Sequence, residues 1–164
     1  MENSQFERNK KRESLKNMYF NRYLLIRYLL AVLLFSNFYW IIFSWGYVIC
    51  IIPALLLSGS ILSAYEMFKM IGNTKPSIQY TKLFFNSQMY VCLAGIFILL
   101  FAPVNIVFPF LTNTLLSRFI SICLFGLGFF IAYIVNKKIK KIESNTDKQY
   151  IKIKQYEKTL RLHL

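Results

Sequence analysis

The chain has 164 residues, of which 56% are hydrophobic and only 16% charged, and its formal net charge is +13. A soluble domain has about 25% charged residues, so this composition excludes an ordinary soluble fold and indicates a single membrane domain. Basic residues resist translocation and are attracted to anionic lipid headgroups. We therefore assign the positive charge to cytoplasmic segments and anionic lipid, and not to nucleic-acid binding.

Charge is missing from three long stretches of the chain. No Asp, Glu, Lys or Arg lies at positions 28–65, 83–117 or 119–136. About 20 helical residues cross the hydrocarbon core of a bilayer. The sequence therefore predicts an all-α integral membrane protein, a bundle of two helical hairpins within residues 23–136. Its four transmembrane helices are expected at about 24–43, 47–65, 83–102 and 115–135.

The first hairpin follows a polar, mostly basic tail at residues 1–22. Residues 44–46 form a very short turn between the first two spans, so these spans are antiparallel neighbours. Arg27 near the start of the first span and Glu66 at the end of the second come to similar depth in this arrangement. We predict an ion pair between them, because a charged side chain at membrane depth needs a partner.

The second hairpin follows a polar loop at residues 66–82. Residues 103–114 are apolar but contain two prolines and are too short to cross, so we expect an interfacial loop, with a re-entrant segment as the alternative. Small residues at four-residue spacing predict close-packing faces on the second and fourth spans. These residues are Ala54, Ser58, Ser60, Ala64, Ser117, Ser121, Gly128 and Ala132.

Two amides, Asn37 and Gln88, lie in apolar surroundings. Each is expected to hydrogen-bond between helices, or alternatively to line a polar path. Counting from the span ends places Asn37 toward the outer half and Gln88 toward the inner half. We therefore do not expect them to bond each other.

Residues 137–164 form a second basic tail with nine cations and three acids. Thr146 and Gln149 have the spacing of a capping box, which predicts a new helix after a break at 144–147. Its apolar face would lie on anionic lipid or dock on a partner, and a loosely solvated, frayed helix is the third possibility. The residues concerned are Tyr150, Ile153, Tyr156, Leu160, Lys152 and Lys158.

The cations also predict the orientation. Both tails and the middle loop are basic, whereas the two opposite connections contain no Lys or Arg. The bias of Lys and Arg toward the cytoplasmic side then places both termini in the cytoplasm, with the bundle in the plasma membrane. The abundant Phe, Ile, Asn and Lys have A/T-rich codons, which favours a low-G+C bacterium.

The residues needed for catalysis are scarce. His163 is the single histidine, Asp147 is the single aspartate, and no Gly-rich phosphate loop occurs. We expect no enzyme activity, cofactor or metal site. The sequence favours a small accessory or regulatory subunit of a larger membrane assembly, for example a transporter or envelope complex, and an immunity-like protein is one version of this. It would contact another membrane protein or a second copy of itself. The alternative is a small homo-oligomeric channel or holin-like pore.

Overall fold

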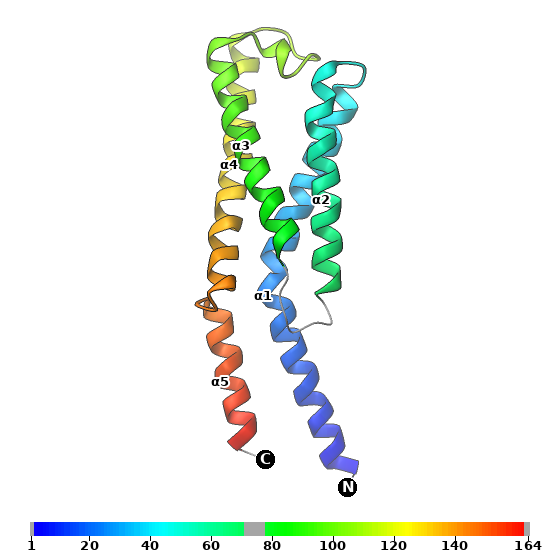
Figure 1. Ribbon diagram of the computed structural model, residues 1–164, viewed down its shortest axis with the longest axis vertical. Coiled ribbons are helices and arrows are strands. Elements are labelled where there is room, and N and C mark those ends of the chain that lie inside the picture. Colours follow the sequence, from blue (N-terminus) through cyan, green and yellow to red (C-terminus); the bar gives the residue numbers. More distant parts are fainter. Residues whose placement is uncertain (1, 71–77, 163–164) are drawn as a thin grey trace.

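The protein is an array of helices, shown by a computed structural model that describes residues 2–70 and 78–162 (Figure 1). The five α-helices are α1 (Glu2–Phe43), α2 (Ile51–Lys69), α3 (Gln79–Phe101), α4 (Leu115–Glu143) and α5 (Lys148–Leu162). Short 3-10 turns cover Val48–Cys50 and Val104–Ile106. Both termini lie at one end of the molecule, here called the tail end, and the connections after α1 and α3 lie at the opposite turn end.

Four of the helices, α1 to α4, are long and apolar enough to cross a membrane. The apolar segments lie within Glu13–Phe43, Val48–Lys69, Gln79–Phe101 and the first part of Leu115–Thr159. This confirms the prediction of an all-α protein with four apolar helices. Such helices satisfy their own backbone hydrogen bonds, which an apolar medium requires. Within the middle loop, residues 71–77 lie outside the described residues.

α1 is longer than the predicted first span. Its 42 residues form one uninterrupted helix that includes nearly all of the expected N-terminal tail. The segment contains neither Gly nor Pro, so nothing in it breaks the helix. At 1.5 Å per residue α1 is about 63 Å long, twice the thickness of a hydrocarbon core. About half of α1 therefore extends beyond the apolar bundle at the tail end (Figure 1).

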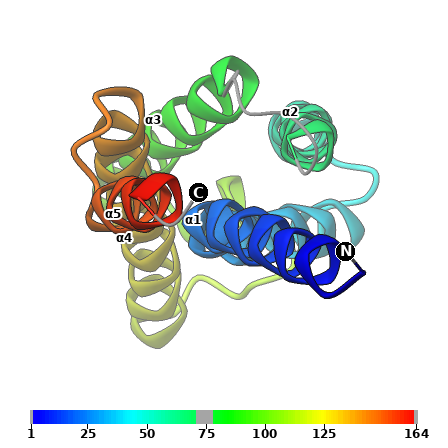
Figure 2. The same ribbon diagram turned by 90° about the horizontal axis from the view of Figure 1, so that it is seen from below.

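The helices pack in chain order, α1 on α2, α2 on α3 and α3 on α4, as the end-on view in Figure 2 shows. One buried cluster fills the half near the tail end and includes Ile26, Phe85 and Ile139. A second cluster fills the half near the turn end and includes Leu99 and Phe125. Each helix buries one stripe in these clusters and exposes large apolar side chains on its outer face.

The predicted interfacial loop folds back on the second cluster. Val104 is fully buried, and the Trp40 indole N–H donates to the Val107 carbonyl over 3.3 Å. The Trp40 ring also packs 5.5 Å from the Phe108 and Phe125 rings, measured between centroids. These contacts anchor the α3–α4 connection to α1.

α3 and α4 approach closely at two glycines. A Cβ atom on Gly95 would lie 2.8 Å from the Phe125 ring, and one on Gly128 would lie 3.0 Å from Cys92 Sγ. Both separations are shorter than ordinary van der Waals contact. The missing side chains therefore let these two helices come together.

We predict that Gly95→Ala destabilises the protein by about 1–3 kcal/mol, because the added methyl group must displace the buried Phe125 ring. Gly126→Ala is the matched control, since nothing lies within 4 Å of a Cβ at that position. This control should be neutral or slightly stabilising. Thermal unfolding of both purified variants in detergent measures the difference, and equal melting temperatures would contradict the close approach.

Candidate functional site

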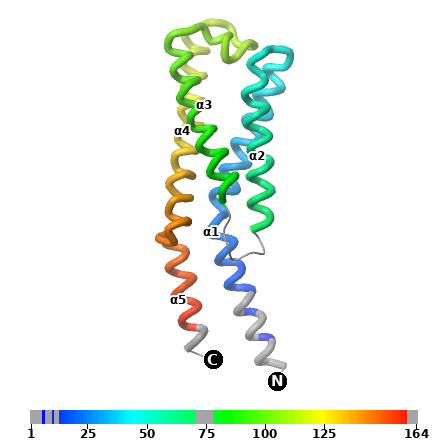
Figure 3. The backbone as a smooth tube through the Cα atoms, viewed as in Figure 1, coloured from blue at the N-terminus to red at the C-terminus, as the bar shows by residue number. Residues whose placement is uncertain are grey.

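The junction between α4 and α5 gathers the most elaborate polar contacts of the described chain. α4 ends in a Schellman arrangement, in which Thr146 N–H donates to the Lys141 carbonyl and Asn145 N–H donates to the Ile142 carbonyl, at 3.0 and 3.1 Å. Asn145 takes a left-handed conformation with φ of 54°, which Asn tolerates better than most residues. The chain therefore turns within four residues and enters α5 (Figure 3).

Asp147 caps the start of α5. Its carboxylate accepts from Tyr150 N–H over 3.2 Å, three residues into the new helix. The prediction of a helix after the break is confirmed, but the predicted capping box of Thr146 and Gln149 is wrong. The physical reason is that the Thr146 hydroxyl lies near Ser144 Oγ, at 2.8 Å, in the preceding turn.

A single arginine from α1 joins both sides of this junction. Arg22 Nε donates to the two Asp147 carboxylate oxygens at 3.0 and 3.1 Å, and Arg22 Nη2 also contacts this carboxylate. The same Nη2 donates to the Ile142 carbonyl and to Asn145 Oδ1, both at 3.1 Å. The guanidinium carbon lies 4.8 Å from the centroid of the Tyr150 ring. We call this group, Arg22 with Asp147, Ile142, Asn145 and Tyr150, the latch.

The latch is buried although it is ionic. Arg22 and Asp147 expose only 2% and 7% of their surface. A buried ion pair is maintained only when further hydrogen bonds satisfy both groups, and here a carbonyl, an amide and a backbone N–H do so. The latch thereby fixes the direction in which α5 leaves α4.

α5 contacts α1 just beyond the bundle, and the two helices separate toward the N- and C-terminal ends (Figures 1 and 2). Ile153 is 1% exposed, and the Tyr19 hydroxyl donates to Glu157 over 3.3 Å. We call residues 2–22 of α1 together with α5 the stalk. The expectation that the apolar face of α5 is free for lipid or another protein is therefore wrong for Ile153, because α1 of the same chain covers it. Tyr150 is only half-buried, beside the guanidinium of Arg22.

The remaining predicted residues of α5 differ in exposure. Lys152 and Lys158 are exposed, and Tyr156 is half-buried. The side chain of Leu160 lies outside the part that the structure describes.

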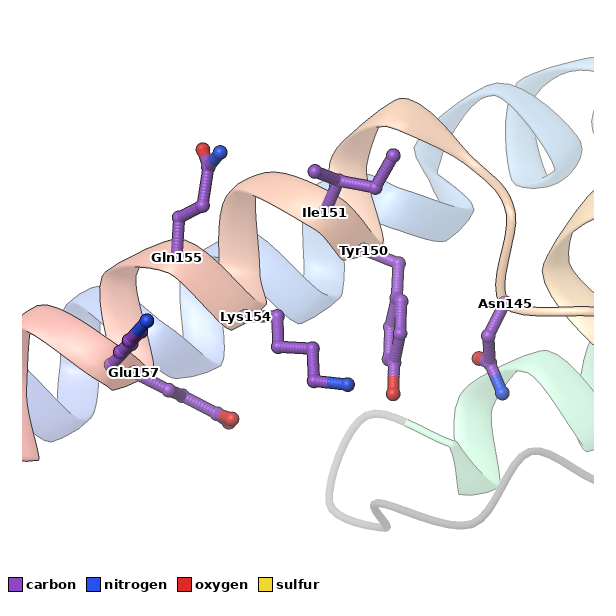
Figure 4. A pocket seen from close by; sticks show the side chains of 7 residues that line it. Asn145, Tyr150, Ile151, Lys154, Gln155 and Glu157 are labelled. Carbon is purple, nitrogen blue, oxygen red and sulfur yellow. The ribbon is translucent and has the colours of Figure 1, made fainter.

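One side of the stalk carries an open, basic hollow of about 610 Å³. Figure 4 shows Tyr150 and Lys154 projecting to the same side of α5 near Asn145, whereas Ile151 and Gln155 project to the other side. Lys158 contributes a second ammonium group to the lining. Glu157 also lines the hollow, which therefore combines an aromatic ring with two cations and one acid and keeps a net positive charge suited to an acidic surface.

Arg27 and Glu66 bind different partners and not each other. Glu66 accepts from Thr81 N–H and Thr81 Oγ1, both at 2.8 Å, and so caps the start of α3. Arg27 Nη2 instead donates to the Met67 carbonyl over 3.2 Å, and its guanidinium lies 4.3 Å from the Phe20 ring centroid. The ion pairs of the described residues are Arg22–Asp147 and Lys82–Glu143, so the predicted Arg27–Glu66 pair is not formed. The donors at the start of α3 attract the carboxylate away from Arg27.

The two intramembrane amides meet, which corrects the expectation that they lie at different depths. Asn37 Nδ2 donates to Gln88 Oε1 over 3.0 Å, and Gln88 Nε2 contacts Cys92 Sγ at 3.6 Å. Depth was counted from the predicted span ends, but α3 begins at Gln79, four residues earlier than predicted, and α1 crosses behind α3 (Figure 1). The pair joins α1 to α3 within the bundle.

The predicted small-residue faces are only partly used within the chain. Ser60, Ser121 and Ala132 are fully buried, and Gly128 faces Cys92. Ala54 and Ser58 are exposed on α2. The remaining two, Ala64 and Ser117, are half-buried.

The described residues contain no group of three or more His, Cys, Asp or Glu side chains that could hold a metal ion. The cysteines Cys50, Cys92 and Cys123 are not joined by disulfides. No protein-family model matches the chain, and comparisons with curated proteins and with solved structures likewise give no match.

The latch was missed by sequence reasoning, which assigned Arg22 to a basic cytoplasmic tail. One available signal was Asp147, the only aspartate, placed directly before a helical pattern where an N-cap is expected. No local pattern in the sequence predicts that Arg22 is the partner of Asp147, because 125 residues separate the two.

We predict that Arg22→Met weakens the tail end by about 3–5 kcal/mol, because it leaves the Asp147 carboxylate buried without its cation. Amide hydrogen exchange should accelerate across residues 148–159 while α2 and α3 keep their protection. Glu143→Gln is the control, since its pair with Lys82 is over 40% exposed and is worth at most about 1 kcal/mol. Equal exchange in the two variants would contradict the role of the latch.

Proposed function

We propose that this chain is a non-enzymatic accessory or regulatory subunit of a larger membrane assembly. In this proposal both termini are cytoplasmic, the bundle lies in the plasma membrane of a low-G+C bacterium, and the stalk presents a basic surface to an acidic partner. An immunity-like protein that shields its own cell is one form of this function.

The stalk is the observation that carries the proposal. Outside the latch, its two segments contain ten cations and four acids. A bundle that served only as a membrane anchor would not require a buried ion pair to orient α5 beside α1. A helix pair fixed in direction presents its charges at defined positions, which lowers the entropy cost of docking.

The polar groups inside the bundle argue against the pore alternative. Asn37 and Gln88 bond each other, and the hydroxyls of the buried Ser60, Ser63 and Ser121 donate to carbonyls of their own helices. A water-filled lumen would require such groups to face a common path. Their hydrogen-bonding capacity is largely used within the chain instead.

The test is stoichiometric co-purification of the tagged, full-length chain from its native membrane in mild detergent. Lys154→Glu with Lys158→Glu should release the partner, because both ammonium groups line the basic hollow and reversal creates like-charge repulsion. Lys69→Glu with Lys140→Glu is the control of equal charge change, at exposed positions outside the stalk. Retention of the partner by the first variant would contradict the proposal.

Ion conductance distinguishes an accessory subunit from a homo-oligomeric pore. We predict that the purified chain conducts no ions in planar bilayers and that Gln88→Leu leaves this unchanged, while lowering stability because Asn37 loses its partner. Ion conductance by a homo-oligomer that Gln88→Leu abolishes would favour the pore.

A further inference from the structure

A second basic pocket lies at the α4–α5 junction, outside the lining of the stalk hollow. It has a volume of about 530 Å³ and is lined by Lys137, Lys138 and Lys141 from α4 and by Lys148 from α5. The ion pairs of the described residues are Arg22–Asp147 and Lys82–Glu143, so no carboxylate among these residues lies within 4.0 Å of the four ammonium groups.

The acid in the pocket wall does not neutralise these lysines. It is Asp147, which is already engaged by Arg22 and by the first turn of α5. Four lysines that line one pocket, beside an acid that is already engaged, create a positive local potential. The pocket is therefore complementary to an anion from outside the chain.

The position of the lysines along α4 matches the headgroup layer of a bilayer. The apolar run of α4 ends at Val135, and residues 137–141 stand about 3–9 Å beyond it. The polar layer on each side of the hydrocarbon core is about 5–8 Å thick. An anion in the pocket would thus lie at the depth of lipid phosphates.

An apolar stripe leads from the bundle into this pocket. Ile134 lines the pocket, and Phe130 and Leu127 lie four and seven residues before it on the same helical face. Phe130 and Leu127 are 60% and 61% exposed, so most of their apolar surface is open. A stripe that is apolar along the bundle and cationic at its end matches the shape of a phospholipid, and a soluble acidic peptide would leave the apolar part unused.

We propose that this pocket binds the headgroup of an anionic phospholipid, whose acyl chain follows Leu127, Phe130 and Ile134. Lipid recognition thereby moves from the apolar face of α5, which α1 covers, to the junction of α4 and α5. The site depends on the α4–α5 junction and on the placement of α4 in a bilayer, and it is independent of the accessory function.

The test is native mass spectrometry of the purified, delipidated full-length chain titrated with phosphatidylglycerol or phosphatidylcholine in detergent. We expect one tightly retained phosphatidylglycerol and no equivalent phosphatidylcholine. Lys138→Gln with Lys141→Gln should weaken retention roughly 25-fold, since each lysine near the surface contributes about fivefold.

Lys10→Gln with Lys16→Gln removes the same charge from exposed positions on α1 outside the pocket and should change retention by no more than about threefold, because distant charges are screened. Circular dichroism and thermal unfolding confirm that both variants fold. Equal weakening by the two variants, or equal retention of both lipids, would overturn the proposal. Displacement of the lipid by millimolar inorganic phosphate would also overturn it and would assign the pocket to free phosphate.

Discussion

The buried contact of Arg22 with Asp147 is the interaction on which the tail end depends. It ties α1 to the last carbonyls of α4, to the turn at Asn145 and to the first turn of α5. Without it, the direction of α5 would be set only by the turn at Asn145, the packing of Ile153 and the Tyr19–Glu157 hydrogen bond. The same contact brings Ile153 against α1, and it leaves the lysines of α5 on the outer surface.

A second constraint comes from the apolar surroundings of the bundle. Polar groups there must find partners within the chain, because no water is available to them. Serines meet this need by bonding carbonyls of their own helices, and Asn37 meets it through Gln88 on another helix. The buried carboxylate of Glu66 finds its partners at the start of α3, where it accepts from Thr81 N–H. The polar contacts of the bundle thus serve assembly, which is consistent with a proposed role in docking instead of transport.

Charge is divided between two surfaces of the tail end. The stalk hollow combines Lys154 and Lys158 with Tyr150, whereas the junction pocket combines four lysines with an apolar stripe on α4. Mixed aromatic and cationic surfaces suit a protein partner, and a cationic pocket at the end of an apolar stripe suits a lipid. In our two proposals the lipid contact holds α4 at a defined depth in the bilayer, and the stalk docks its partner from that position.

The sequence by itself determined the four apolar helices and the segments that carry charge, because hydropathy and charge are local properties of the chain. It also determined α5, whose helical pattern follows the single aspartate. Only the tertiary structure decided which polar groups meet: Asn37 with Gln88, Arg22 with Asp147, and Glu66 with Thr81. These pairings depend on how each helix is rotated and inclined against its neighbours. Packing of side chains such as Phe125 on Gly95 sets those angles, and no local pattern of residues encodes them.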